Sequence, residues 1–115
     1  MVLDSGDSAI EPELEIAMLT ASFDARPGAE ETLLGALSRY VVLTRHEPGC
    51  RNVDLVASVT QPGRFLVIEK WDSAEHVQHH LDSPLMVDMA HAVVDAITAR
   101  PAIDLYDTIS AHDLN

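Results

Sequence analysis

Hydrophobic and polar positions along the 115 residues follow two spacings, which together predict four strands and three helices. In four stretches the side chains alternate between two faces with a period of two, which is typical of strands. Between these stretches, apolar residues recur every three or four positions, which is typical of helices. The strands are predicted at 14–23, 50–59, 64–71 and 102–109. The helices are predicted from about 28 to 46, at 74–81, and from 83 to about 100.

Turn-forming residues separate these elements. The segment Glu47-Pro48-Gly49 ends the first helix, because the residue before a proline disfavours helical backbone. Residues 60–63, Thr-Gln-Pro-Gly, are short enough for a hairpin, so the second and third strands are expected to pair antiparallel. Ser83 followed by Pro84 is a common start of a helix, and Arg100-Pro101 is expected to end that helix.

The order of the elements is strand, helix, strand, strand, helices, strand. This order predicts an α+β, ferredoxin-like fold, in which helices cover one face of a four-stranded antiparallel sheet. Apolar residues nevertheless point to both faces of the strands, as Val53 and Val56 or Leu66 and Val67 show. The face without helices therefore needs a cover. We expect a second copy of the chain to supply it, sheet against sheet, in a C2 homodimer.

A single domain accounts for this pattern. Residues 1–13 are small and acidic and have no periodicity, so we expect a flexible N-terminal lead-in. Residues 14–109 form the domain, and residues 110–115 form a polar C-terminal tail.

The composition narrows the possible functions. A net charge of -12 argues against binding to nucleic acid or to an anionic membrane, since both require a basic face. No apolar run approaches the roughly 18 residues of a membrane helix, and the N-terminal residues do not resemble a signal peptide, so we expect a cytoplasmic protein. The single cysteine, Cys50, excludes an intrachain disulfide. Cys50 is either a small residue at the start of a strand or a reactive thiol, which would require a neighbouring cation or base.

Three of the six histidines, His76, His79 and His80, lie on one predicted helix. Their spacing brings His76 and His80 to the same face and raises the possibility of a zinc site. A zinc site needs three or four ligands, and no cysteine or further spaced histidine completes a recognisable motif. The alternative is that His76 and His79 are solvated helix residues.

Glu69 and Trp71 share one face of the third strand with apolar neighbours. A carboxylate in such a position is either paired with another group or has a shifted pKa, which would suit a pocket acid or base. Trp71 is either a core residue or the wall of an apolar pocket. Met86 and Met89 are likewise either core residues or the lining of an adaptable pocket.

Three segments resemble the antibiotic biosynthesis monooxygenase family, which includes quinol monooxygenases and polyketide-anthrone oxygenases. The resemblance covers about residues 14–109. It rests on Glu47-Pro48-Gly49-Cys50, on the strand from Phe65 to Glu69-Lys70-Trp71, and on His80-Leu81-Asp82-Ser83-Pro84.

The resemblance implies a dimeric α+β barrel that oxidises a quinol, an anthrone or a related polycyclic phenol with O2. It implies no metal, flavin or nicotinamide cofactor, which agrees with the absence of nucleotide- and metal-binding motifs from the sequence. By position His80 matches the histidine of the family, and it is the first candidate to orient or deprotonate the substrate. Glu69 and Trp71 are expected to act beside it. The substrate pocket is expected to be lined by Tyr40, Phe65, Met86 and Met89.

The sequence departs from its relatives in two places. Leu85 stands where many of them have a histidine, and the first strand lacks the asparagine that the haem-degrading branch uses. Haem degradation is therefore the least favoured function. The main alternative to an oxygenase is a dimeric ligand-binding or stress-response module without turnover.

Overall fold

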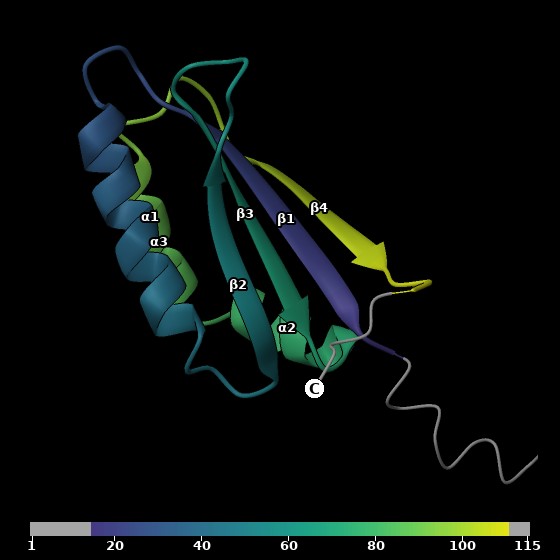
Figure 1. The fold of residues 1–115 in the computed structure, drawn as a ribbon. Helices are drawn as coiled ribbons and strands as arrows, with labels where there is room; N and C mark the ends of the chain where they lie inside the picture. The colour runs from purple at the N-terminus through teal and green to yellow at the C-terminus, as the bar shows by residue number, and fades with distance from the viewer. Residues whose placement is uncertain (1–14, 111–115) are drawn as a thin grey trace, which may run out of the picture.

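The computed structural model describes residues 15–110. The predicted lead-in 1–13, Leu14 and residues 111–115 of the predicted tail lie outside the described residues. Seven elements follow one another along the chain (Figure 1). They are β1 (Ala17–Asp24), α1 (Glu30–Thr44), β2 (Cys50–Ala57), β3 (Arg64–Trp71), α2 (Ala74–Leu81), α3 (Pro84–Val93) and β4 (Ala102–Asp107).

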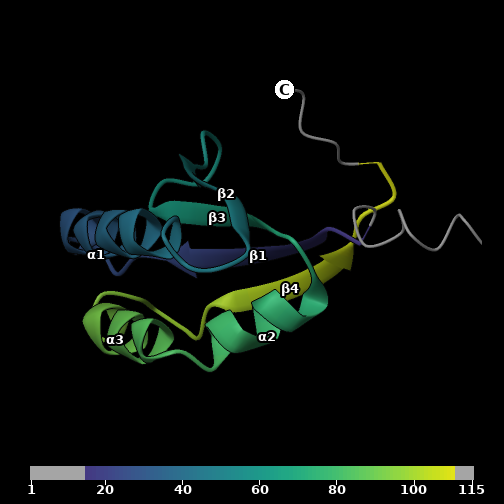
Figure 2. The same cartoon turned by 90° about the horizontal axis from the view of Figure 1, so that it is seen from below.

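The four strands form one antiparallel sheet in the order β2-β3-β1-β4. β2 and β3 are joined by the predicted hairpin, whose Gly63 has a φ of +86° that suits glycine best. The helices lie on one side of the sheet (Figures 1 and 2). The predicted α+β, ferredoxin-like fold is therefore confirmed.

The core lies between the sheet and the helices. Alternate residues of β1 and β3 are buried, because every second side chain of a strand points to the same face. α1 presents a buried stripe at helical spacing to this face. Fully or almost fully buried core residues include Leu19, Phe23, Leu33, Leu37, Val53, Val67 and Trp71. The predicted orientation of Glu69 and Trp71 toward the helices is confirmed, since both are fully buried on this face.

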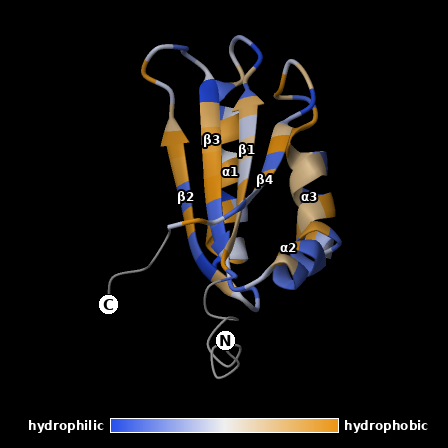
Figure 3. Cartoon of the chain, turned by 90° about the vertical axis from the view of Figure 1, so that its right-hand side faces the viewer, coloured by the Kyte–Doolittle hydropathy of each residue, from blue (hydrophilic) through white to orange (hydrophobic). Residues whose placement is uncertain are grey.

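The opposite face of the sheet is turned to the viewer in Figure 3, where the strands contain both hydrophobic and hydrophilic residues. The strand register places Leu66 and Ile68 of β3 on this face, beside Val56 of β2. Leu66 and Ile68 are half-buried and Val56 is 45% exposed. Asp54 and Asp104 flank this apolar row, so the face is less uniformly apolar than the alternation in the sequence suggests.

The third helix is shorter than predicted. α3 ends at Val93, whereas the apolar spacing that continues to Ile97 predicted a helix to about residue 100. The backbone after the helix bonds instead to the end of β1, since Arg26 donates to the carbonyl of Ala96 and Ile97 forms a bridge with Ala25. Ile97 is buried by this turn, which explains why its spacing imitates a helical position.

Other boundaries differ from the prediction by a few residues. α1 ends at Thr44, β2 ends at Ala57, and β4 ends at Asp107. The hydroxyl of Ser58 accepts backbone N–H bonds from the hairpin turn, which ends β2 before the predicted residue 59. All six residues of the edge strand β4 are exposed. No helix in the described part of the chain is long and apolar enough to cross a membrane.

Candidate active site

Five side chains from different parts of the chain converge where β3 ends. They form what we call the buried network, which consists of Tyr40 from α1, Glu47 from the loop after α1, Glu69 and Trp71 from β3, and His80 from α2. Four of the five residues are at most 3% exposed, and Glu47 alone is partly accessible, with 23% of its side chain exposed.

His80 lies at the centre of the buried network, and both of its ring nitrogens have partners. Nδ1 is 2.7 Å from Oε1 of Glu47. Nε2 is 2.6 Å from the hydroxyl oxygen of Tyr40 and 3.5 Å from Oε1 of Glu69. The side chain of His80 is fully buried. A substrate therefore cannot reach either nitrogen of His80 without displacing a protein group.

The two oxygens of Glu69 are held by different donors. Oε2 lies 2.5 Å from the hydroxyl oxygen of Tyr40, and the indole N–H of Trp71 donates to Oε1 over 2.9 Å. The indole and imidazole rings of Trp71 and His80 are 4.6 Å apart between centroids and tilted by 32°. Trp71 therefore acts as a hydrogen-bond donor to Glu69 and as an aromatic wall for His80.

The hydrogen bonds of Tyr40 define the protonation of its neighbours. A tyrosine has one O–H proton and cannot donate to Glu69 and to His80 at once. When Tyr40 donates to Glu69, Nε2–H of His80 must donate to Tyr40. If Nδ1–H also donates to Glu47, the ring is an imidazolium that lies between two carboxylates.

Burial controls the acidity of these groups. It raises the pKa of Glu69 above its ordinary value, and the bonds and charges of Tyr40, His80 and Trp71 only partly oppose the rise. The pKa of Tyr40 is raised far above its ordinary value, first by burial and then by the charge of Glu69. Tyr40 therefore stays a neutral phenol, and Glu69 binds a proton more readily than an exposed carboxylate does.

Local capping interactions fix the position of His80 on α2. The hydroxyl of Ser73 accepts from the backbone N–H of His76 at the start of the helix. After the helix, the hydroxyl of Ser83 donates to the carbonyl of His80 over 2.7 Å and also caps α3. Pro84 occupies the first turn of α3, where a proline is well tolerated. These residues explain why a serine and a proline follow His80 at this spacing.

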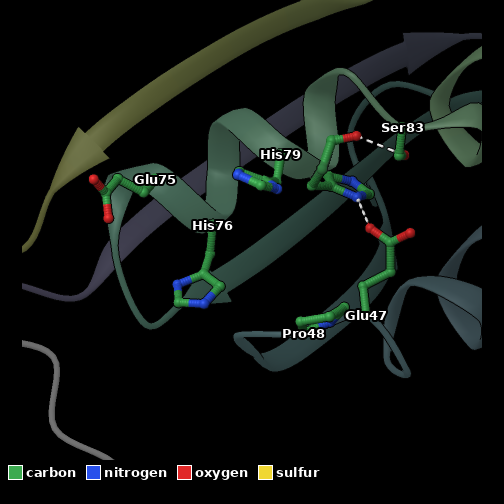
Figure 4. A pocket seen from close by; sticks show the side chains of 7 residues that line it. Glu47, Pro48, Glu75, His76, His79 and Ser83 are labelled. Carbon is green, nitrogen blue, oxygen red and sulfur yellow. Dashed lines mark hydrogen bonds and ion pairs between the residues drawn. The ribbon is translucent and has the colours of Figure 1, made fainter.

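A cavity of about 500 Å³ opens beside the buried network. We call it the mouth cavity (Figure 4), and it is lined by Glu47, Pro48, Glu75, His76, His79, His80 and Ser83. A cavity of this volume could hold an aromatic molecule of two or three rings. The dashed line from the carboxylate of Glu47 in Figure 4 is its bond to Nδ1 of His80. Glu47 is therefore the exposed end of a network that is otherwise closed to solvent.

Sequence reasoning named seven site residues, and the structure brings four of them together: His80, Glu69, Trp71 and Tyr40. Met86 and Met89 line a separate, more apolar cavity of about 440 Å³ between α3 and the start of β4. Phe65 lies near the start of β3, paired with Phe23, at the far end of the strand from Trp71. These three residues do not line the mouth cavity.

Glu47 was missed as a site residue. In the sequence, Glu47 directly precedes Pro48-Gly49 and so belongs to the stop signal of the first helix. Its occurrence in one of the three segments that carry the family resemblance was the available signal. Neither its spacing nor its neighbours indicate that it bonds to a histidine 33 residues later.

The other candidate groups behave differently. Within residues 15–110, no group of three or more His, Cys, Asp or Glu side chains is arranged to hold a metal ion. His76 is half-buried and its Nδ1 is 2.8 Å from the hydroxyl of Ser73, whereas His79 is exposed. Burial, and then the charge of Glu69, raises the pKa of the Cys50 thiol to about 11, which argues against a nucleophilic thiolate.

Comparisons with known proteins agree with the resemblance. The sequence pattern of the antibiotic biosynthesis monooxygenase family matches residues 16–92. The chain is 30% identical over 83 residues to a proposed monooxygenase of Mycobacterium tuberculosis, Rv0793, covering 72% of this chain and 81% of that protein. The solved structure of Rv0793 superimposes with a TM-score of 0.78 at 26% identity, covering 85% of this chain and 99% of that one. A proposed antibiotic biosynthesis monooxygenase of Deinococcus radiodurans shares the fold, with a TM-score of 0.77, 24% identity, and coverage of 86% and 98%.

Proposed function

We propose, from the fact that this chain belongs to the antibiotic biosynthesis monooxygenase family, that it oxidises a quinol, an anthrone or a related polycyclic phenol with O2. One oxygen atom enters the substrate and the other leaves as water. The substrate supplies all four electrons, as in the conversion of a hydroquinone to a hydroxyquinone or of an anthrone methylene to a carbonyl. The reaction so written balances without an external reductant, and we propose that it needs no metal, flavin or nicotinamide.

One observation supports this proposal above the others: the carboxylate of Glu47 faces a cavity of about 500 Å³ and is backed by a buried histidine. A phenol must lose a proton before it can readily give electrons to O2. Glu47 is the group of the buried network that a substrate hydroxyl in the mouth cavity can reach. We assign it the role of general base.

His80 then acts through Glu47 and does not touch the substrate. Its Nδ1 fixes the orientation of the carboxylate, as the second group of a catalytic pair does. His80 is a positioning residue in this proposal. Trp71 and Glu69 hold the ring of His80 from the other side.

Oxygen uptake tests the proposal. The purified protein is incubated with a panel of hydroquinones and anthrones under air, with EDTA present. We expect turnover that EDTA does not reduce and that Glu47→Gln lowers by about 100-fold or more, the usual contribution of a general base. Glu75→Gln is the matched control, since Glu75 also lines the mouth cavity but has no bond to His80. It should change the rate by about threefold or less, because Glu75 is solvent-exposed and its charge is screened.

The alternatives give different results in the same experiment. Quenching of the fluorescence of Trp71, the single tryptophan, without oxygen uptake would indicate a ligand-binding module. Haem degradation would appear as a Soret band on addition of haemin that bleaches under a reductant. Equal rates in Glu47→Gln and the wild type would contradict the assignment of the base.

We further propose that two copies of the chain associate through the sheet face that lacks helices. The half-buried residues Leu66 and Ile68 support this proposal, since they lie in a continuous row beside the exposed Val56. Light scattering at micromolar concentration should give twice the chain mass of 12.5 kDa. A strictly monomeric mass would leave this face without a cover and would contradict the proposal.

A further inference from the structure

Three short contacts connect Glu47 to Glu69 in a linear chain of hydrogen bonds. The sequence of contacts is Glu47 to Nδ1 of His80, 2.7 Å; Nε2 of His80 to the oxygen of Tyr40, 2.6 Å; and that oxygen to Oε2 of Glu69, 2.5 Å. Glu47, at one end of this chain of hydrogen bonds, faces the mouth cavity, and Glu69, at the other end, is fully buried. Each contact is short enough for a strong hydrogen bond, so each holds one proton.

The proposed function uses only the outer part of this chain of hydrogen bonds, Glu47 and His80. General base catalysis by Glu47 requires His80, but it gives no reason for a buried carboxylate and a buried phenol behind the ring. A second carboxylate inside the protein has a desolvation cost that a purely structural contact would not require. The positions of Tyr40 and Glu69 therefore call for a role of their own.

We propose that Tyr40 and Glu69 form the inner half of a proton relay, an inference that rests on the proposed function. The relay removes a proton from His80 when Glu47 takes the proton of the substrate. The substrate O–H bond breaks and an O–H bond forms on Glu47. The Nε2–H bond of His80 breaks and an O–H bond forms at Tyr40, while the original O–H proton of Tyr40 moves to Oε2 of Glu69. The result is a neutral carboxyl at each end, a neutral imidazole and a neutral phenol.

The geometry supports each step. At rest, the imidazolium of His80 is flanked by two carboxylates, which stabilise its charge. Once Glu47 is protonated, only Glu69 remains as a partner, and transfer of one proton replaces a buried ion pair with neutral groups. The burial that raises the pKa of Glu69 helps this carboxyl to accept the proton. The raised pKa of Tyr40 means that it gives up its own proton only as it receives another.

Trp71 selects the oxygen that is protonated. An indole N–H only donates, so Oε1 of Glu69 remains an acceptor in every state. The transferred proton must then sit on Oε2, which is the oxygen that faces Tyr40. The other titratable groups at the rim of the mouth cavity are Glu75, His76 and His79 of α2. Cys50 of β2 lies within electrostatic reach of Glu69, Glu47 and Arg45.

Nuclear magnetic resonance tests the relay without any substrate. Glu47→Gln is a neutral mimic of protonated Glu47 with the same shape. We expect both ring nitrogens of His80 to carry protons in the wild type at pH 7. In Glu47→Gln, the ¹⁵N signal of Nε2 should become that of an unprotonated nitrogen, and the ¹³C signal of the Glu69 carboxyl should become that of the protonated form at the same pH.

The coupling between the two signals is the decisive result. A merely structural contact predicts that His80 loses its proton to solvent and that Glu69 stays ionised. That outcome would overturn the relay. So would a His80 that keeps both protons in Glu47→Gln, or a His80 that is neutral in the wild type.

A kinetic experiment separates the relay from the proposed function. With an active substrate, Tyr40→Phe should lower kcat by about 10-fold to 100-fold and leave KM unchanged, within the range of proton-transfer effects. Rates in mixtures of H2O and D2O should follow a curve in the wild type, since several protons move, and a straight line in Tyr40→Phe. Tyr106→Phe is the matched control, because Tyr106 is half exposed on β4.

Failures of the two proposals look different. If Glu47→Gln abolishes turnover while Tyr40→Phe keeps both its rate and the curved isotope dependence, the relay is wrong and the proposed function stands. If no phenol in the panel is turned over, the proposed function fails, and the resonance experiment still decides whether the proton moves between His80 and Glu69.

Discussion

Replacement of Gly49 by alanine tests how the loop after α1 positions the mouth cavity. Gly49 has a φ of +82°, which an alanine adopts at a cost of about 1–2 kcal/mol. A Cβ atom on Gly49 would also lie 2.2 Å from the ring of His76, so that ring must move away. The movement breaks the 2.8 Å contact between His76 and the hydroxyl of Ser73, which contributes about 1 kcal/mol. The total loss of unfolding free energy should be about 2–3 kcal/mol.

Two other glycines provide matched controls. Gly28 and Gly63 each have a φ of +86°, but a Cβ atom on Gly28 would meet nothing within 4 Å and one on Gly63 nothing closer than 3.8 Å. Their alanine variants should lose only the backbone contribution of about 1–2 kcal/mol. Urea denaturation followed by Trp71 fluorescence measures all three variants on one scale.

A double variant isolates the clash. In a His76→Ala background, Gly49→Ala should cost less than in the wild type, because the ring is absent and only the 2.8 Å contact with the Cβ atom of residue 76 remains. If Gly49→Ala is no more destabilising than Gly28→Ala in the wild-type background, the packing of His76 against Gly49 does not contribute to stability and the reasoning fails.

Three further changes have defined outcomes. The raised pKa of Glu69 means that the folded state binds a proton more tightly than the unfolded state. The stability from this group is therefore present below about pH 4 and is lost as the pH rises through the folded pKa. Urea titrations across pH should show a smaller decline of the unfolding free energy in Glu69→Gln than in the wild type, and an identical decline would contradict the prediction. Thr44→Val should raise the unfolding free energy by about 1 kcal/mol, because the hydroxyl of Thr44 is fully buried and makes no hydrogen bond of good geometry to a described residue. A loss of stability would indicate that this hydroxyl is bonded to the nearby Tyr40 or to a water. Ile68→Glu should give a monomeric mass in light scattering, while Val59→Glu, on the exposed hairpin, should keep the doubled mass of the proposed dimer.

The sheet and the order of its elements could be predicted because they follow from local patterns. A period of two and the turn at 60–63 fix β2 and β3, and their antiparallel pairing follows from the short hairpin. The end of α3 could not be predicted in this way. The apolar spacing of Ile97 continues that of Val93, and only the bridge from Ile97 to Ala25 shows that the chain has already left the helix.

The site could be predicted in part. Glu69 and Trp71 stand out because a carboxylate and the single tryptophan share a buried strand face, which is visible in the alternation alone. The partners of Glu69 are not visible there. Tyr40 occupies an ordinary position in an apolar helix stripe, and its hydroxyl reaches Glu69 only because α1 packs on the sheet face to which Glu69 points. The cavity beside Met86 and Met89 shows the same limit, since apolar spacing identifies a buried face but not the cavity that it lines.

The three segments that carry the family resemblance meet at one place in the fold. The loop Glu47-Pro48-Gly49 supplies the exposed carboxylate, β3 supplies Glu69 and Trp71, and the segment from His80 to Pro84 supplies the ring between them. A different local feature positions each segment: the positive φ of Gly49, the alternation of β3, and the bond from Ser83 to the carbonyl of His80. Because these features lie in different elements, each can be disrupted separately. Loss of any one should disturb the same contact, the 2.7 Å bond between Glu47 and His80 beside the mouth cavity.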